Sequence, residues 1–127
     1  MARVVLDASA VLAYLNGETG ADRVAPFIGD ARISTVNIAE VEAHLLSRGG
    51  TIDDVRAVLA IVALEIVDFD RELADTTASF AAPTRPQGLS LGDRACLALA
   101  LRDGLPAVTS DRAWQQTNLG VKIQLIR

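Results

Sequence analysis

Residues 3–15 read Arg-Val-Val-Leu-Asp-Ala-Ser-Ala-Val-Leu-Ala-Tyr-Leu, and the change of pattern within them decides the fold. The first four residues are too few and too β-branched for a helix, so they predict a short strand over residues 3–6. Asp7 ends this strand. The next residues, 8–15, predict a helix that closes at Asn16-Gly17. The chain therefore opens with a strand that passes directly into a helix.

The same alternation continues to the end of the chain. Further strands are expected at residues 32–36, 65–69, 106–109 and 122–126. Further helices are expected at residues 21–28, 37–48, 51–63, 70–80, 90–102 and 111–116. Residues 82–88 contain two prolines and are expected to form the one long loop. Strands alternating with helices predict an α/β fold with three layers, in which helices cover both faces of a mostly parallel sheet of about five strands.

The composition is that of one compact domain over residues 1–127. Half of the residues are hydrophobic but only five are aromatic, so the core must be built from Ala, Val, Leu and Ile. The single cysteine, Cys96, has no partner for an internal disulfide, and no apolar stretch reaches the length of a membrane span. We therefore expect a cytoplasmic protein without a membrane segment.

The charge balance is acidic. Sixteen Asp and Glu against twelve Lys and Arg give a formal net charge of −4, whereas phosphate binding normally leaves a basic footprint. An acidic net charge is compatible with phosphate binding if several acids form one metal site, because bound cations would cancel their charge locally. All but one of the basic residues are arginines, whose planar fork suits phosphate and carboxylate groups alike.

Four acidic residues stand where a parallel sheet would bring them together. Asp7 follows the first strand and Asp111 follows the fourth, so both belong at the carboxyl edge of the sheet. Glu40 opens the helix after the second strand. Asp93 opens the helix before the fourth strand and reaches the same edge if that helix also starts there. The sequence therefore allows all four carboxylates to share one rim.

Each of these acids also has a purely structural interpretation. Asp is a favoured N-cap residue, and both Asp7 and Asp111 precede a helix. The segments Asn37-Ile-Ala-Glu40 and Ser90-Leu-Gly-Asp93 both have the spacing of a capping box. Taken singly, each acid fits a helix cap. Their shared place at one edge of the sheet favours a common site.

Carboxylates gathered in one place repel one another and require a counter-charge. Mg²⁺ is a hard cation that takes oxygen ligands and keeps several waters, so it suits such a cluster. One cysteine and one histidine, His44, are too few for a zinc site. The sequence therefore predicts a site for Mg²⁺.

The motifs around these acids resemble those of the PIN-domain family. They are Val-Val-Leu-Asp-Ala-Ser at 4–9, Glu40, Leu-Ser-Leu-Gly-Asp-Arg-Ala-Cys-Leu-Ala-Leu-Ala at 89–100, and Thr-Ser-Asp-Arg-Ala-Trp at 109–114. The length and the flanking residues are most similar to the VapC ribonuclease toxins of type II toxin–antitoxin systems. The resemblance spans essentially the whole chain.

The resemblance implies a three-layer PIN fold and a Mg²⁺- or Mn²⁺-dependent endoribonuclease. It also implies a homodimer and a small cognate antitoxin that blocks the site. Residue by residue, the acidic quartet of the family matches Asp7, Glu40, Asp93 and Asp111, while its hydroxyl positions match Ser9 and Thr109. The implied reaction is hydrolysis of an RNA phosphodiester, leaving a 5′-phosphate and a 3′-hydroxyl.

Three arginines near these motifs are candidates for binding RNA phosphates. Arg94 and Arg112 each follow a quartet aspartate, and Arg85 lies in the proline-containing loop. Ordinary ion pairing with surface acids is the other interpretation of each. The other interpretation of the whole chain is a non-catalytic PIN-fold module that binds a protein partner.

Overall fold

The computed structural model describes all 127 residues. Its strands are β1 (Val4–Leu6), β2 (Ala31–Ser34), β3 (Glu65–Val67), β4 (Ala107–Thr109) and β5 (Ile123–Leu125). Its α-helices are α1 (Ala8–Asn16), α2 (Ala21–Val24), α3 (Thr35–Leu46), α4 (Ile52–Val62), α5 (Arg71–Ser79) and α6 (Leu91–Asp103). Three short 3₁₀ helices complete the fold: η1 (Ala25–Phe27), η2 (Arg85–Gln87) and η3 (Arg112–Gln116). Every strand and helix expected from the sequence is present, the last helix as η3.

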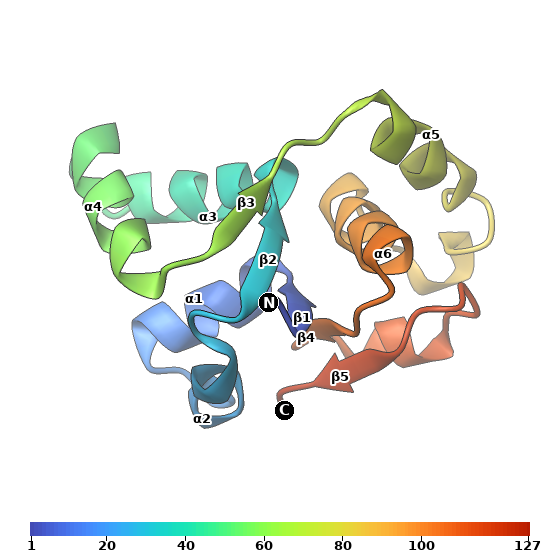
Figure 1. Cartoon of the computed structure of the whole chain (residues 1–127), viewed down its shortest axis with the longest axis horizontal. Coiled ribbons are helices and arrows are strands. Elements are labelled where there is room, and N and C mark those ends of the chain that lie inside the picture. The colour runs from blue at the N-terminus through green and yellow to red at the C-terminus, as the bar shows by residue number, and fades with distance from the viewer.

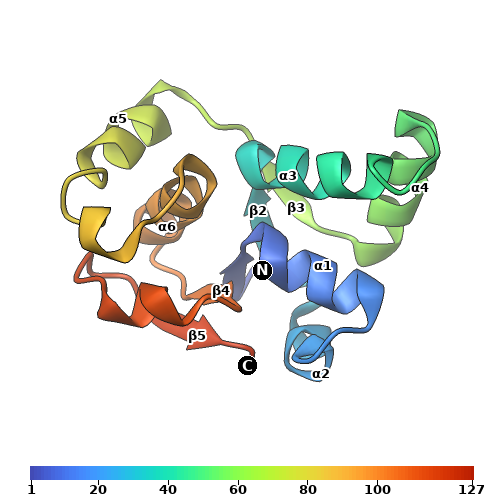
Figure 2. The ribbon, with the colours of Figure 1, turned by 180° about the vertical axis from the view of Figure 1, so that it is seen from behind.

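The five strands form one sheet in the order β3-β2-β1-β4-β5, and all four pairings are parallel. The sheet lies between two groups of helices, with α1 to α4 on one side and α5 and α6 on the other (Figures 1 and 2). The predicted three-layer α/β fold is confirmed, and the sheet is parallel throughout. None of the helices is long and apolar enough to cross a membrane.

The central strand β1 supplies both cores, because successive side chains of a strand point to opposite faces. Val4 and Leu6 belong to the hydrophobic cluster beneath α1 to α4. Val5 belongs to the second cluster, beneath α5 and α6, together with the buried Trp114. All three strand residues are fully or almost fully buried. This double burial explains why β1 reads as a continuous apolar run.

The start of α3 corrects the expected cap. Ser34, the last residue of β2, is the N-cap, and its side chain accepts a hydrogen bond from the backbone N–H of Val36 at 3.2 Å. Asn37 is already helical, so the predicted strand over 32–36 was too long and the capping box of Asn37 and Glu40 is wrong. The serine takes the cap because it is the last residue of the strand, where the chain is still extended.

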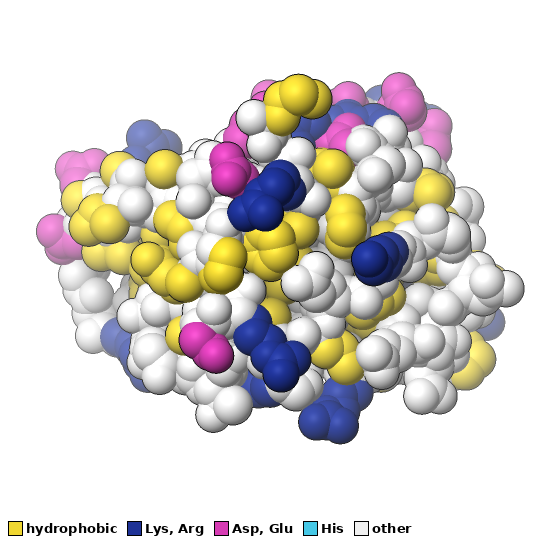
Figure 3. Space-filling model, turned by 60° about the horizontal axis from the view of Figure 1, so that its bottom comes forward, with side chains coloured by type: hydrophobic (Ala, Val, Ile, Leu, Met, Phe, Trp, Pro, Cys, Tyr) yellow, Lys and Arg dark blue, Asp and Glu magenta, His cyan; other side chains and the backbone are white.

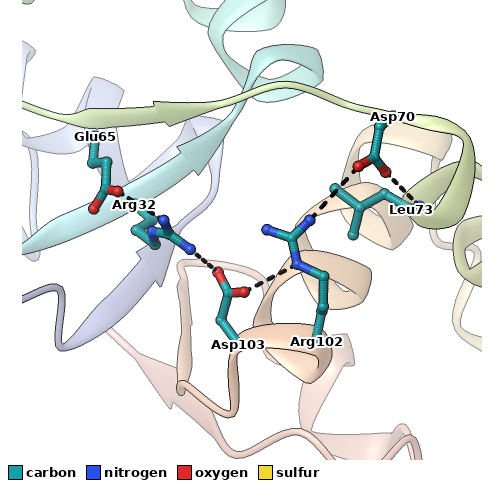
Figure 4. Close-up of polar contacts among 6 residues, drawn as sticks. All are labelled: Arg32, Glu65, Asp70, Leu73, Arg102 and Asp103. Carbon is teal, nitrogen blue, oxygen red and sulfur yellow. Dashed lines mark hydrogen bonds and ion pairs between the residues drawn. The ribbon is translucent and has the colours of Figure 1, made fainter.

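An ion-pair network ties the layer of α5 and α6 to the sheet near the amino ends of β2 and β3 (Figure 4). The guanidinium of Arg32 donates to Glu65 at 2.7 Å and also to Asp103 at the end of α6. Asp103 in turn accepts a hydrogen bond from Arg102 at 3.0 Å, and Arg102 lies 3.9 Å from Asp70, the N-cap of α5. These pairs raise the pKa of Arg32 and lower that of Glu65, through their shared hydrogen bond first of all. The network joins β3, β2, α6 and α5.

Arg32→Met should lower the free energy of unfolding by about 1 kcal/mol or more, because Asp103 is only 14% exposed and loses a charged donor. Urea unfolding at low salt measures this loss. Arg71→Met is the matched control: it removes the Arg71–Asp75 pair, which is largely exposed, and should cost less than about 0.5 kcal/mol. Equal losses in the two variants would contradict a structural role for the network.

Candidate active site

A pocket of about 370 Å³ opens beyond the carboxyl ends of the central strands and collects all four predicted acids. Its lining residues are Asp7, Ala8, Ser9, Leu12, Asn37, Glu40, His44, Asp93 and Asp111. They come from α1, α3, the first turn of α6 and the segment after β4. The pocket is therefore built from four separated stretches of the chain, and only two of its nine lining residues are hydrophobic.

Asp7 is the buried centre of this arrangement. As N-cap of α1 its Oδ1 accepts hydrogen bonds from the backbone N–H of Ala10 at 2.9 Å and from the hydroxyl of Ser9 at 2.7 Å. Its Oδ2 accepts one from the hydroxyl of Thr109 at 2.6 Å. The side chain of Asp7 thus joins the end of β1 to the end of β4, and the two predicted hydroxyl residues both contact it.

Burial governs the ionisation of Asp7. Only 4% of the residue is exposed, and this desolvation raises the pKa of Asp7 from 3.8 to about 6, although the three hydrogen bonds favour the carboxylate. The charge of Asp93 raises the pKa of Asp7 further. Burial also raises the pKa of the Cys96 thiol well above its usual value, and the charges of Asp7, Asp93 and Glu40 add to this rise. Cys96 is thus a buried, protonated side chain behind the acids.

Asp93 and Asp111 each cap a helix with one carboxylate oxygen. Asp93 Oδ2 accepts a hydrogen bond from the backbone N–H of Ser90 at 2.8 Å, which confirms the predicted capping box at the start of α6. Asp111 Oδ1 accepts one from the backbone N–H of Ala113 at 2.9 Å. The second oxygen of each carboxylate has no protein donor. The structural role and a ligand role are therefore compatible in the same side chain.

Glu40 is held differently, through a residue whose part in the pocket the sequence did not indicate. The side-chain amide of Asn37 donates to Glu40 Oε1 at 2.8 Å and to the carbonyl oxygen of Gly92 at 3.0 Å. Asn37 is 1% exposed. In the sequence, the only sign of this role is that Asn37 is polar and lies one helical turn before Glu40. The expected capping box gives Asn37 a different role, at the start of the helix.

No basic side chain balances the charge of the four acids. The seven ion pairs of the molecule involve other acids, and none includes Asp7, Glu40, Asp93 or Asp111. Carboxylate oxygens without a cationic partner suit a hard divalent cation. No three acidic, histidine or cysteine side chains converge closely enough to hold a metal ion directly. The donor set nevertheless fits Mg²⁺, which retains several waters that can bridge to carboxylates around a pocket.

The family model of the PIN domain matches residues 4–119. The chain belongs to the PIN-domain family. No curated protein sequence matches it. The fold is therefore that of a PIN domain, as the resemblance of the motifs implied.

Solved structures show the same fold at low sequence identity. A DNA-bound VapBC from Salmonella typhimurium is 20% identical, has a TM-score of 0.77, and the match covers 100% of both chains. A toxin–antitoxin complex from Klebsiella pneumoniae is 16% identical over 98% of each chain, with a TM-score of 0.73. VapC20 of Mycobacterium tuberculosis, a sarcin-ricin loop cleaving toxin, is 18% identical over 94% of this chain and 98% of its own, with a TM-score of 0.73.

The three candidate arginines of this PIN domain lie outside the lining of the acidic pocket. Arg94 is half-buried and donates to the carbonyl oxygen of Thr77 on α5, so it links α6 to α5. Arg85 and Arg112 are exposed and form no ion pair. They begin η2 and η3, two segments that contact each other. Pairing with surface acids therefore does not account for Arg85 and Arg112.

The charge is unevenly distributed over the surface. Figure 3 shows a face on which basic side chains lie among apolar ones, while most acids in view lie towards its margins. A second and larger hollow, of about 590 Å³, lies between α3 and α4. Six of its nine lining residues are hydrophobic, unlike those of the acidic pocket.

In EDTA, the PIN domain should lose stability as the pH rises from about 4 to above 6. The pKa of Asp7 is higher in the folded than in the unfolded chain, so the folded state binds this proton more tightly, and the benefit disappears once the group ionises in both states. The loss from this group amounts to about 3 kcal/mol of unfolding free energy. Urea unfolding across this pH range gives the unfolding free energies of wild type and Asp7→Asn, and the difference between their pH dependences measures this loss.

Parallel pH curves for wild type and Asp7→Asn would contradict a buried, unbalanced carboxylate. At pH 7 and above, adding Mg²⁺ should raise the melting temperature of the wild type by mass action, because the four carboxylates line one pocket only in the folded chain. Asp7→Asn should show a much smaller rise.

Proposed function

We propose that this PIN domain is a metal-dependent endoribonuclease and the toxin of a type II toxin–antitoxin pair. The observation that carries the proposal is the acidic pocket: carboxylates from four separated segments line one cavity and have no basic partner. A group of this kind costs stability unless a cation balances it. The four carboxylates lie at the carboxyl edge of a parallel sheet, where α/β folds bind ligands, and this location supports a catalytic role.

The proposed ligands of Mg²⁺ or Mn²⁺ are Asp7 and Asp93, with Asp111 and Glu40 completing the set. When bound, such a cation lowers the pKa of a coordinated water and neutralises charge on the scissile phosphate. Asp7 is already oriented by its hydrogen bonds to Ser9 and Thr109. Glu40, at the exposed side of the pocket, would orient the attacking water and accept its proton.

The similar structures support the same activity. One is described as a sarcin-ricin loop cleaving toxin, and the others named above come from toxin–antitoxin complexes. Their identity to this chain is at most 20%, so RNA as the substrate rests jointly on the family and the pocket. The proposed partners are an RNA substrate, a small cognate antitoxin and a second copy of the chain. The proposed location is the cytoplasm.

A non-catalytic PIN module that binds a protein partner is the second candidate function. It is favoured by the absence of a ready-made set of three metal ligands and by the net charge of −4. A module of this kind would retain the acids only as helix caps. The two candidates differ in one property, which is metal-dependent cleavage of RNA.

Purified protein free of antitoxin should cleave RNA with Mg²⁺ or Mn²⁺ and stop when EDTA is added. Asp93→Asn should reduce the rate by more than about 100-fold, because even residues that only support a metal ligand cost about 10–100-fold. Asp54→Asn is the matched control, since Asp54 forms the same capping box in α4, with the same 2.8 Å hydrogen bond, away from the acidic pocket. It should leave cleavage unchanged.

Intact RNA under both metals would favour the binding module. Cleavage that persists in EDTA would contradict the role of the carboxylates as metal ligands. An equal loss of cleavage rate in Asp54→Asn would mean that Asp93→Asn acts only by weakening a helix cap.

Arg85 and Arg112 are the proposed phosphate contacts outside the pocket. Replacing either with Ala should weaken RNA binding across sequences and make the salt dependence of log K shallower by about 0.7 to 1 per lost contact. Binding is best measured in the Asp93→Asn background, in which the RNA stays intact. Arg71→Ala removes an arginine that is already paired with Asp75 and serves as control. An unchanged slope would remove these arginines from the interface.

A further inference from the structure

Glu40 differs from the other three acids of the pocket in how it is held. Asp7, Asp93 and Asp111 each cap a helix, so backbone N–H groups fix their carboxylates. Glu40 lies in the second turn of α3, is exposed, and caps nothing. A glutamate has one more rotatable bond than an aspartate, so its carboxylate needs other contacts to occupy one position. Two residues supply them.

The first is Asn37, whose buried amide has only one possible orientation. Both of its neighbours on the nitrogen side, Glu40 Oε1 and the Gly92 carbonyl oxygen, are acceptors, so the amide nitrogen must face them. Its Oδ1 is thereby left without a hydrogen-bond partner in a buried place. Leaving a buried acceptor unpaired costs free energy. Asn37 therefore holds α3, α6 and the Glu40 carboxylate together at a cost to stability.

The second is Gly92, in the first turn of α6. It is the one glycine of the nine without a positive φ, so its backbone does not require glycine. In a helix, glycine is less stable than alanine. A Cβ at this position would lie 2.6 Å from Glu40 Oε2 and Cδ and still closer to Oε1. Space for the Glu40 carboxylate is therefore what glycine provides here.

We propose that Asn37 and Gly92 are positioning residues that fix the Glu40 carboxylate in the acidic pocket. The inference rests on the proposed function, because it assigns the two residues to the reaction of that site. Asn37 occupies Oε1 and leaves Oε2 without a protein donor, available to a water molecule. Gly92 precedes Asp93 directly, so its contact with Glu40 also sets the separation of the Glu40 and Asp93 carboxylates.

The test is a pair of double-mutant cycles with Glu40. Asn37→Ala and Gly92→Ala should each lower kcat for RNA cleavage by about 10- to 100-fold, as loss of a supporting residue does, with KM changed less than about twofold. In a Glu40→Ala background, either substitution should change kcat by less than about twofold, because the group it positions is absent. Asn16→Ala is the control, since Asn16 donates to Glu18 and accepts a hydrogen bond from Arg48 on the surface, outside the lining of the acidic pocket.

A stability readout separates positioning from folding. Gly92→Ala should displace the Glu40 carboxylate in the wild type and break its hydrogen bond with Asn37, so any gain in melting temperature should be smaller there than in the Glu40→Ala background. In the Glu40→Ala background it should raise the melting temperature by a few degrees, because alanine favours the helix.

The outcomes distinguish the two proposals. Suppose that the wild type cleaves RNA. If Asn37→Ala and Gly92→Ala then keep the wild-type kcat, or lower kcat by the same factor with and without Glu40, the positioning role is overturned and the nuclease stands. If the wild type cleaves no RNA with Mg²⁺ or Mn²⁺, the nuclease is overturned and the positioning role with it. Non-additive losses of kcat together with a larger melting shift of Gly92→Ala in the Glu40→Ala background than in the wild type would support both.

Discussion

The hydrogen bonds around the buried Asp7 carboxylate are the interaction on which the pocket depends. They join the ends of the two central strands, β1 and β4, through Ser9 and Thr109. The hydroxyl of Thr109 also accepts a hydrogen bond from the backbone N–H of Asp111, which places the next acid of the quartet. The positions of two acids thus follow from one buried side chain. The cost is a carboxylate that is poorly solvated and has no basic neighbour.

The same carboxylates can cap a helix and line the acidic pocket in this fold. A helix N-terminus presents free N–H groups and a partial positive charge, which fix one oxygen of an aspartate and favour its ionised form. The other oxygen of Asp93 and of Asp111 is left for the pocket. Parallel strands bring several such helix starts to one edge of the sheet. In this chain, most acids of the pocket therefore also serve ordinary helix capping.

The sequence predicts the order of strands and helices, the three layers and the four acids, because each depends on local pattern or on the shared edge of a parallel sheet. The part that it did not predict is tertiary. Ser34 takes the cap that we assigned to Asn37, which frees Asn37 to bridge α3 and α6. Gly92 appears in the sequence only as a glycine inside a helix. A side chain at this position would collide with the carboxylate of Glu40, which lies 52 positions earlier along the chain. Contacts between distant segments leave no local signal.

The burial of Cys96 has a practical consequence for following motion in this protein. A thiol reacts with alkylating reagents as the thiolate, and burial together with the nearby acids disfavours that form here. Cys96 lies on α6, is fully buried in the hydrophobic cluster that α6 forms with the sheet and α5, and is the only cysteine of the chain. Modification then requires α6 to detach from the sheet, at least transiently. The rate of labelling would report how often the helix that carries Asp93 comes away from its neighbours, without an engineered probe.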